Sequence, residues 1–195
     1  MEKIILGVDP GTLILGYSIL SIEEGTPHLL AMDVLYLKKI ADYNLRIRKI
    51  FDSMQEIIDR YHPDHLAIEA PFFGKNVQSM LKLGRAQGVT IAAAMSRDLS
   101  FSEYEPATIK QTVAGNGNAS KDQVLRMLQA QMGIDLNPKY LDASDALAAA
   151  YTCYRMMYNP KADIQQLLKP QAKTRKKSSR AAWGDFVSQN PDKIK

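Results

Sequence analysis

Four acidic residues stand where a strand end or the first turn of a helix would present a carboxylate. Asp9 ends an apolar run beside a proline-glycine turn, and Glu69 ends a second apolar run just before a proline. Asp142 and Asp145 are three residues apart, so in a helix their side chains share a face. If the two strands are parallel neighbours, Asp9 and Glu69 lie side by side at the carboxyl edge of the sheet, where functional groups of open α/β sheets collect.

Four carboxylates in one place make a site for cations. Like charges raise carboxyl pKa values and cost stability unless cations neutralise them. Mg²⁺ prefers oxygen ligands and takes a few carboxylates together with waters and substrate phosphate. Two such ions about 3.5–4 Å apart would activate a water and stabilise the leaving oxygen of an in-line phosphoryl displacement. Each acid alone also has an ordinary interpretation, as a turn residue, a solvated strand end or a first-turn residue favoured by the helix dipole.

Two lysines and a glycine-rich loop add groups that suit a phosphate. Lys110 precedes the loop 115–117, and Lys121 follows Ser120, the first residue of a capping-box sequence that ends at Gln123. A glycine-rich loop that leads into a helix presents backbone N–H groups to phosphate, and a lysine there adds positive charge. A flexible loop with solvated lysines is the alternative. No Gly-Lys-Ser/Thr sequence follows, so the loop is not a nucleotide-binding P-loop.

The elements that would position these residues follow from hydropathy patterns and turn residues. Short connections join the first three strands, which predicts an antiparallel meander, whereas the last two strands alternate with helices and must run parallel beside it. The sequence therefore predicts an α/β fold with a mixed five-stranded sheet, a three-strand meander plus two parallel strands, flanked by helices. The expected strands are 3–9, 14–22, 28–37, 65–69 and 100–104, and the expected helices are about 45–61, 76–97, 106–113, 121–132 and 141–158.

The second expected helix carries small and apolar residues along one stripe. Gly84 and Gly88 are four residues apart on it and leave a shallow groove, where another helix or strand can approach closely. The stripe consists of Val77, Leu81, Gly84, Gly88, Ile91 or Ala92, and Met95.

The net charge of +4 is not spread evenly over the 195 residues. Residues 169–195 contain eight Lys or Arg and two Asp, a charge of +6, whereas residues 1–168 contain 17 basic and 19 acidic residues, a charge of −2. We therefore expect one globular domain over residues 1–160 and a basic, flexible tail over residues 161–195. Solvated disorder is the ordinary interpretation of the tail; a DNA-binding arm or a docking peptide for a partner protein is the alternative.

Secreted and membrane-spanning classes of protein do not fit the sequence. The single cysteine, Cys153, cannot form an internal disulfide, and its apolar surroundings predict a buried thiol, which fits a reducing cytoplasm. The apolar run 4–8 is too short for a signal peptide, and no run approaches the roughly 18 apolar residues of a membrane span. We expect a cytoplasmic protein with no membrane partner.

The four acids lie in three of six motifs whose order is typical of one family. Through these motifs the chain resembles the RuvC-type Holliday junction resolvases from Ile4 to about Tyr158. Asp-Pro-Gly-Thr alone would be a weak signal, but the ordered set is specific. The motifs are residues 7–12 with 16–17, residues 67–69 with 74–76, and residues 83–88, 109–117, 119–121 and 142–148.

The resemblance implies a ribonuclease-H-like fold and a homodimeric endonuclease that makes symmetric paired nicks in four-way DNA junctions during recombination and DNA repair. It implies Mg²⁺ as cofactor, with two ions in each active site and Mn²⁺ as a substitute. It also implies a branch-migration complex of RuvA- and RuvB-type proteins as a partner. In the family the helix that matches residues 76–97 lies at the dimer interface; packing of the glycine stripe on the chain's own sheet is an equally ordinary explanation.

Roles for single residues also follow from the resemblance. Lys110 and Lys121 match basic catalytic residues near the scissile phosphate, which they would position while stabilising transition-state charge. The metal-binding catalytic carboxylates are matched by Asp9, Glu69, Asp142 and Asp145.

DNA contacts are expected on both sides of these residues. Phe72 matches an aromatic that stacks on an unstacked base at the crossover, although Phe73 can exchange roles with it and either ring can instead anchor the loop. Asn118 stands where many family members carry a basic residue, which puts one phosphate contact in doubt. Further expected DNA contacts are Lys75, Lys82, Arg85, Asn116 and Ser120.

Three rival interpretations remain open at the level of the sequence. An Asp-x-Gly-Thr loop after a first strand also binds phosphate in sugar kinases and actin-like ATPases, but their two lobes need a longer chain and a second glycine-rich loop. A DNA-structure-binding protein without catalysis would be favoured by loss of one of the four acids, and all four are present. A related nuclease that cuts another branched DNA or RNA is the third.

Overall fold

The computed structural model describes residues 2–71, 76–136 and 141–158. The bounds of its helices and strands differ from the predicted ones by at most two residues. The strands are β1 (Lys3–Asp9), β2 (Ile14–Glu23), β3 (Thr26–Tyr36), β4 (His65–Glu69) and β5 (Ser100–Tyr104). The helices are α1 (Tyr43–Tyr61), α2 (Val77–Met95), α3 (Pro106–Ala114), α4 (Lys121–Met132) and α5 (Leu141–Tyr158).

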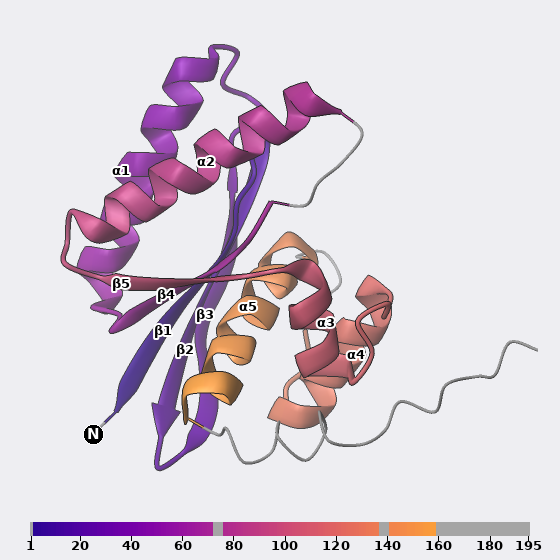
Figure 1. The fold of residues 1–195 in the computed structure, drawn as a ribbon. Coiled ribbons are helices and arrows are strands. Elements are labelled where there is room, and N and C mark those ends of the chain that lie inside the picture. The colour runs from indigo at the N-terminus through magenta and orange to yellow at the C-terminus, as the bar shows by residue number, and fades with distance from the viewer. Residues whose placement is uncertain (1, 72–75, 137–140, 159–195) are drawn as a thin grey trace, which may run out of the picture. The chain divides into compact units, whose positions relative to one another are not determined.

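The strands form one mixed sheet in the order β3-β2-β1-β4-β5 (Figure 1). β2 pairs antiparallel with both β1 and β3, and β4 runs parallel to both β1 and β5. The predicted meander with two parallel strands is therefore confirmed. Val8 pairs with Ile68 in the β1–β4 register, so Asp9 and Glu69, one residue further on, end neighbouring strands at the same edge of the sheet.

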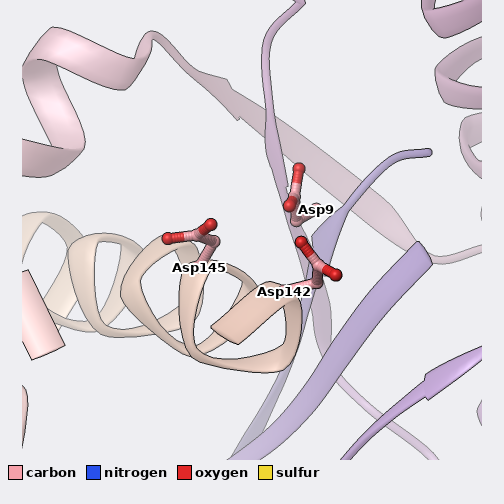
Figure 2. A group of neighbouring side chains, drawn as sticks. All are labelled: Asp9, Asp142 and Asp145. Atoms are coloured by element: carbon pink, nitrogen blue, oxygen red, sulfur yellow. The ribbon is translucent and has the colours of Figure 1, made fainter. Parts of the chain in front are cut away.

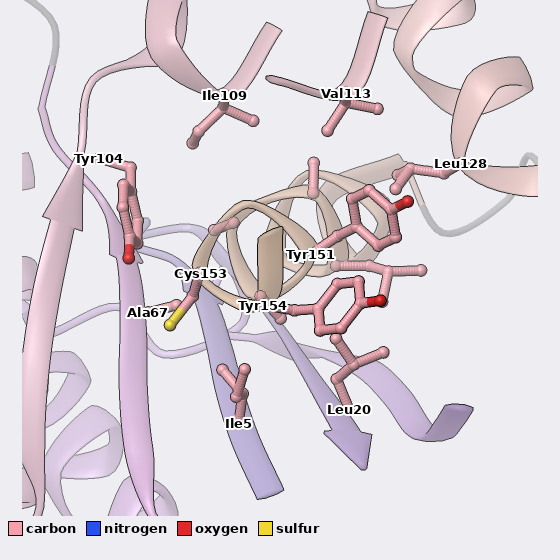
Figure 3. Packing of buried hydrophobic residues seen from close by; sticks show 14 of the residues in the cluster. Ile5, Leu20, Ala67, Tyr104, Ile109, Val113, Leu128, Tyr151, Cys153 and Tyr154 are labelled. Carbon is pink, nitrogen blue, oxygen red and sulfur yellow. The ribbon is translucent and has the colours of Figure 1, made fainter. Parts of the chain in front are cut away.

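Helices cover both faces of the sheet. α1 and α2 lie on one face, and α5 lies on the other with α3 and α4 beside it (Figure 1). Because side chains alternate along a strand, Ile5 of β1 belongs to the buried cluster around α5, and Leu6 belongs to the cluster under α1. The cluster around α5 also holds Cys153, whose thiol is buried as predicted (Figure 3).

α1 packs on the sheet through only part of its apolar stripe. Ile50, Met54 and Ile57 are buried against the sheet, but Leu45 is 56% exposed. Leu45 lies in the first turn of α1, where its N–H donates to the capping side chain of Asp42. The apolar stripe of α1 thus extends to a residue that does not pack on the sheet.

Two glycines bring α5 closer to the sheet than a side chain would allow. A Cβ atom built on Gly16 would lie 2.0 Å from the carbonyl oxygen of Asp142, and one on Gly7 would lie 2.2 Å from the carbonyl oxygen of Ala146. Both distances are far inside van der Waals contact, so the backbone of α5 rests directly on β1 and β2. This contact holds the first turns of α5 beside the carboxyl end of β1.

None of the helices within the described ranges is long and apolar enough to cross a membrane. The predicted tail, residues 161–195, lies outside the described residues. The division into a domain of residues 1–160 and a basic tail therefore stays a prediction.

We expect Gly16→Ala to lower the free energy of unfolding by about 3 kcal/mol or more, because the new methyl group must displace backbone rather than a flexible side chain. Ser18→Ala is the matched control on the same face of β2. The Ser18 hydroxyl is buried and has no hydrogen-bond partner among the described residues, so its removal should be neutral or slightly stabilising. Urea denaturation of both variants measures the difference, and equal stabilities would contradict the close approach of α5.

Candidate active site

Three aspartates from two elements meet at the carboxyl end of β1 (Figure 2). Asp9 is the last residue of β1, and Asp142 and Asp145 lie near the start of α5. Each of the three offers a carboxylate oxygen, and these oxygens all lie within 4.8 Å of one another. The structure thus brings three of the four predicted carboxylates into one group that one cation can contact.

Glu69 lies beside this group and is not a member of it. It ends β4 next to Asp9, and its charge raises the pKa of Asp9. Glu69, Asp9 and Asp145 line the same cavity, which has a volume of about 490 Å³. The other lining residues are Pro106, Ala107, Ile109, Lys110, Gly117, Asn118, Lys121, Val124 and Ala148.

Both predicted lysines line this cavity. The Nζ atom of Lys121 donates a hydrogen bond to Asp145 and forms an ion pair with it. Lys110 lies close enough that its charge lowers the pKa values of Glu69 and Asp145. Acidic and basic side chains therefore line the same cavity and touch one another at the Lys121–Asp145 pair.

The carboxylates carry more negative charge than the lysines neutralise. Burial, together with the charges of Glu69 and Asp145, raises the pKa of Asp9 to about 8. Burial and the charge of Asp145 raise the pKa of Glu69 to about 7. Burial also raises the pKa of Asp145, although Lys121 opposes this shift. For Lys121 the burial effect lowers the pKa, but the bond to Asp145 and the charges of the three aspartates together outweigh it, so the pKa is raised.

The chemistry of this donor set suits a hard divalent cation. The three clustered groups offer only carboxylate oxygens, which are the ligands that Mg²⁺ prefers. A cation bound there would remove the repulsion that raises these pKa values. The described residues thus fit a metal ion held by Asp9, Asp142 and Asp145.

The glycine-rich loop is fixed by a residue that the sequence did not single out. The Gln111 side chain accepts a hydrogen bond from the Gly117 N–H and donates one to the Gly115 carbonyl oxygen. These bonds hold Gly117 and Asn118 in the cavity wall. A glutamine six residues before a glycine gives no recognisable signal, so this role could not be found without coordinates.

Two predicted DNA contacts near the loop have other neighbours. The Asn116 side chain accepts from the Asn118 N–H and lines a separate hollow beside α4. Ser120 is the N-cap of α4, and its hydroxyl accepts from the Gln123 N–H in the predicted capping box. Neither side chain lines the acidic cavity, so a DNA contact by Asn116 or Ser120 stays a prediction.

The two predicted contacts on α2, Lys82 and Arg85, do not line the acidic cavity. Lys82 lines a different hollow, between α1 and α2, and the Arg85 guanidinium lies 6.0 Å from the centre of the Tyr43 ring. Phe72, Phe73 and Lys75 lie outside the described residues, so their roles stay predictions.

We expect the metal-free protein to lose stability as the pH rises from about 4 to about 8. The Asp9 carboxyl has its ordinary pKa of 3.8 in the unfolded chain and about 8 in the folded one. Between these two pKa values unfolding releases the proton of Asp9, so a rise in pH favours the unfolded state. This contribution is fully present below pH 3.8 and is lost as the pH rises through 8; Glu69 acts in the same direction between 4.5 and about 7.

Asp9→Asn removes the largest of these shifts. At pH 8 in EDTA it should raise the free energy of unfolding by about 1–3 kcal/mol, the equivalent of one or two pKa units. Asp52→Asn, at a half-exposed carboxylate on α1, should leave the pH profile unchanged. Denaturation curves at several pH values measure both. The electrostatic account fails if the two variants behave alike.

Comparison with known proteins agrees with this geometry. The sequence matches the family described as crossover junction endodeoxyribonuclease RuvC over residues 5–153. The protein of that name from Christiangramia forsetii is 50% identical over 194 residues, which cover 100% of this chain and 94% of that protein. The one from Porphyromonas gingivalis is 48% identical over 197 residues, with 100% and 98% covered.

A solved structure shares the fold. T. thermophilus RuvC, in complex with a Holliday junction substrate, matches with a TM-score of 0.71 at 28% identity, over 77% of this chain and 92% of that one. The predicted ribonuclease-H-like sheet is thereby confirmed. The family match spans all four acids and both lysines, and it excludes a sugar kinase or an actin-like ATPase. The chain belongs to the RuvC family of crossover junction endodeoxyribonucleases.

Proposed function

We propose that this endonuclease resolves Holliday junctions by hydrolysing one phosphodiester in each of two strands, in a reaction that requires Mg²⁺. The observation that carries the proposal is the cavity in which Asp9, Glu69 and Asp145 face Lys110 and Lys121. Acids and lysines around one cavity suit a phosphodiester and the cations that accompany it. The T. thermophilus relative is bound to a Holliday junction substrate in its solved structure, which supports junction DNA as the substrate here.

Asp9, Asp142 and Asp145 would hold the metal, with Glu69 beside them as a further ligand or as a base for the attacking water. Bound Mg²⁺ supplies Lewis acidity toward a phosphate oxygen and lowers the pKa of water. Two ions in each site, with Mn²⁺ as a substitute, complete this part of the proposal. The raised pKa values of Asp9 and Glu69 support it, because they mark buried negative charge that the neighbouring lysines leave uncompensated.

The lysines would act on the DNA directly. Lys121 donates to Asp145 and is still 63% exposed, so its ammonium can contact a phosphate oxygen without leaving its partner. Lys110 lines the same cavity, where its charge would oppose the negative charge that develops on the phosphate in the transition state.

We infer that the protein forms a homodimer in which α2 packs against α2 of a second copy of the chain. On this helix Ala86, Gln87, Thr90, Ala93 and Ala94 are buried against the chain's own core, whereas the glycine stripe lies on the other side, where Ala92 is exposed. Ile91, the alternative member of the stripe, packs partly against the core. Val77 is 64%, Leu81 52% and Met95 60% exposed, and a Cβ on Gly84 or Gly88 would meet no atom within 4 Å. A dimer with two-fold symmetry matches the approximate symmetry of a four-way junction and gives each nicked strand its own active site.

Several finer parts of the proposal concern partners. We propose that Phe72 or Phe73 stacks on an unpaired base and that Lys75 contacts a phosphate. We also propose that a RuvA- and RuvB-type branch-migration complex docks on the basic tail. We also propose that the protein acts in the cytoplasm, which the endodeoxyribonuclease activity named for its relatives supports.

An immobile four-way junction and a linear duplex of the same sequence test the activity. We expect the wild-type protein with Mg²⁺ to nick two opposite strands of the junction symmetrically and to leave the duplex intact. Asp145→Asn should reduce the cutting rate at least about 100-fold, because it removes a charged ligand, and should leave junction binding within about twofold. Gel mapping of the nicks measures the activity, and a gel-shift titration measures binding.

Asp135→Asn serves as control, because this exposed carboxylate does not line the cavity and, among the described residues, accepts a hydrogen bond from Gln129 alone. It should cut like the wild type. Binding of the junction by the wild-type protein without any cutting would instead favour a DNA-structure-binding protein, and equal cutting of the duplex would contradict junction specificity.

The proposed dimer is tested by Leu81→Glu, which introduces charge into the exposed stripe. We expect a monomer by size-exclusion chromatography with light scattering, at concentrations where the wild type is a dimer. Leu30→Glu, at a similarly exposed leucine on β3, should leave the dimer intact. A wild-type protein that is monomeric, or a Leu81→Glu protein that remains dimeric, would refute this interface.

A further inference from the structure

A second hollow lies on the other side of the acidic group from the catalytic cavity. It has a volume of about 450 Å³ and opens between the loop after β1, the first turn of α1 and the first turns of α2. Gly11 and Thr12 come from the loop, Tyr43 and Arg46 from α1, and Lys82 from α2. We refer to it as the α1–α2 hollow.

We infer that the α1–α2 hollow binds a backbone phosphate of the DNA strand that is cut, within one or two nucleotides of the scissile phosphate, and that Arg46, Tyr43 and Lys82 hold it. This inference rests on the proposed function, because it assigns the hollow to the same substrate. It adds two residues to the strand path that no motif indicated.

The position of the hollow relative to the metal group supports this assignment. Asp142 lines the hollow, whereas Asp9 and Asp145 line the catalytic cavity, and the carboxylate oxygens of all three lie within 4.8 Å of one another. The acidic group is thus a common wall between the two spaces. A strand whose scissile phosphate lies at this wall must leave the catalytic cavity on one side or the other, and the α1–α2 hollow is the space directly adjoining it.

The charged groups of the hollow suit a phosphate. The Arg46 Nε atom donates to the Ile40 carbonyl oxygen at 2.5 Å, which fixes the guanidinium and leaves its two terminal nitrogens free of any bond to the described residues. Lys82 has no hydrogen-bond or ion-pair partner among those residues. A metal ion on Asp142 would neutralise the negative charge of that residue. The hollow would then hold two uncompensated positive charges, those of Arg46 and Lys82, and the Arg46 guanidinium is a fixed planar donor of the kind that binds phosphate best.

Tyr43 gives a second, independent sign of a ligand. Its hydroxyl is buried and has no hydrogen-bond partner within the described part of the chain, and Tyr43 is one of the residues that line the hollow. A buried hydroxyl without a partner costs free energy that a phosphate oxygen would recover by accepting from it. Arg85 lies 6.0 Å from the centre of the same ring and would hold the ring in place while adding positive charge at the rim.

The experiment uses the full-length protein and a four-way junction. Arg46→Gln and Tyr43→Phe should each weaken junction binding about fivefold to tenfold, measured in the Asp145→Asn background so that the DNA stays uncut. Arg46→Gln should also lower the slope of log Kd against log salt by about 0.9, the value for one phosphate contact. Arg48→Gln is the matched control, because this arginine lies two residues away on α1, is 79% exposed and does not line the hollow.

Arg46→Gln could weaken binding by destabilising the fold, because Arg46 also donates to the Ile40 carbonyl oxygen. Lys82→Gln tests the hollow without this effect, because Lys82 has no hydrogen-bond or ion-pair partner among the described residues. It should reduce the salt slope as Arg46→Gln does, with an unchanged melting temperature. If Arg46→Gln, Tyr43→Phe and Lys82→Gln all bind like Arg48→Gln, the inference is overturned.

Neutral methylphosphonates, introduced one at a time beside the scissile phosphate, locate the contact. One position should weaken wild-type binding about fivefold to tenfold and weaken the Arg46→Gln protein no further. If a methylphosphonate weakens binding by the wild-type and the Arg46→Gln proteins equally at every position, the inference is overturned. Failure of the proposed function is distinguishable, because the wild-type protein would then cut no junction whatever these variants do.

Discussion

The direct contact between the backbone of α5 and the glycines of β1 and β2 is the constraint on which the site depends. Gly7 and Gly16 have no side chain to hold the helix away, so the carbonyl oxygens of Asp142 and Ala146 occupy space that a Cβ atom would take. Only this spacing lets carboxylates from a helix near residue 142 reach a carboxylate at residue 9. Both glycines lie within the motifs around Asp9, which links their presence to geometry rather than to flexibility.

The same contact creates the electrostatic problem that a cation solves. It gathers Asp9, Asp142 and Asp145 while β4 adds Glu69 through its register with β1. Burial and mutual repulsion then raise the pKa values of Asp9 and Glu69 toward neutrality. Lys121 relieves part of this by its bond to Asp145. A divalent ion relieves the rest, so the fold stores in its metal-free state an unfavourable charge arrangement that binding reverses.

Much of this was predictable from the sequence, and the exceptions have physical reasons. Strand lengths, helix starts and the parallel pairing of β1 with β4 follow from local hydropathy and connection lengths, so the meeting of Asp9 and Glu69 could be predicted. The glycine stripe of α2 could not be assigned to the core or the surface, because period alone does not say which face is covered; the structure buries the opposite face. The pinning of the loop by Gln111 and the joining of Tyr43 with Lys82 in one hollow depend on tertiary packing that no local pattern records.

The central claim, that the converging carboxylates form a metal site, is tested most directly by anomalous diffraction from crystals of the wild-type protein soaked in Mn²⁺. We expect an anomalous peak within coordination distance of carboxylate oxygens from Asp9 and from at least one of Asp142 and Asp145. It would be contradicted by crystals in which Mn²⁺ binds elsewhere, or nowhere, while these three carboxylates stay within 4.8 Å of one another.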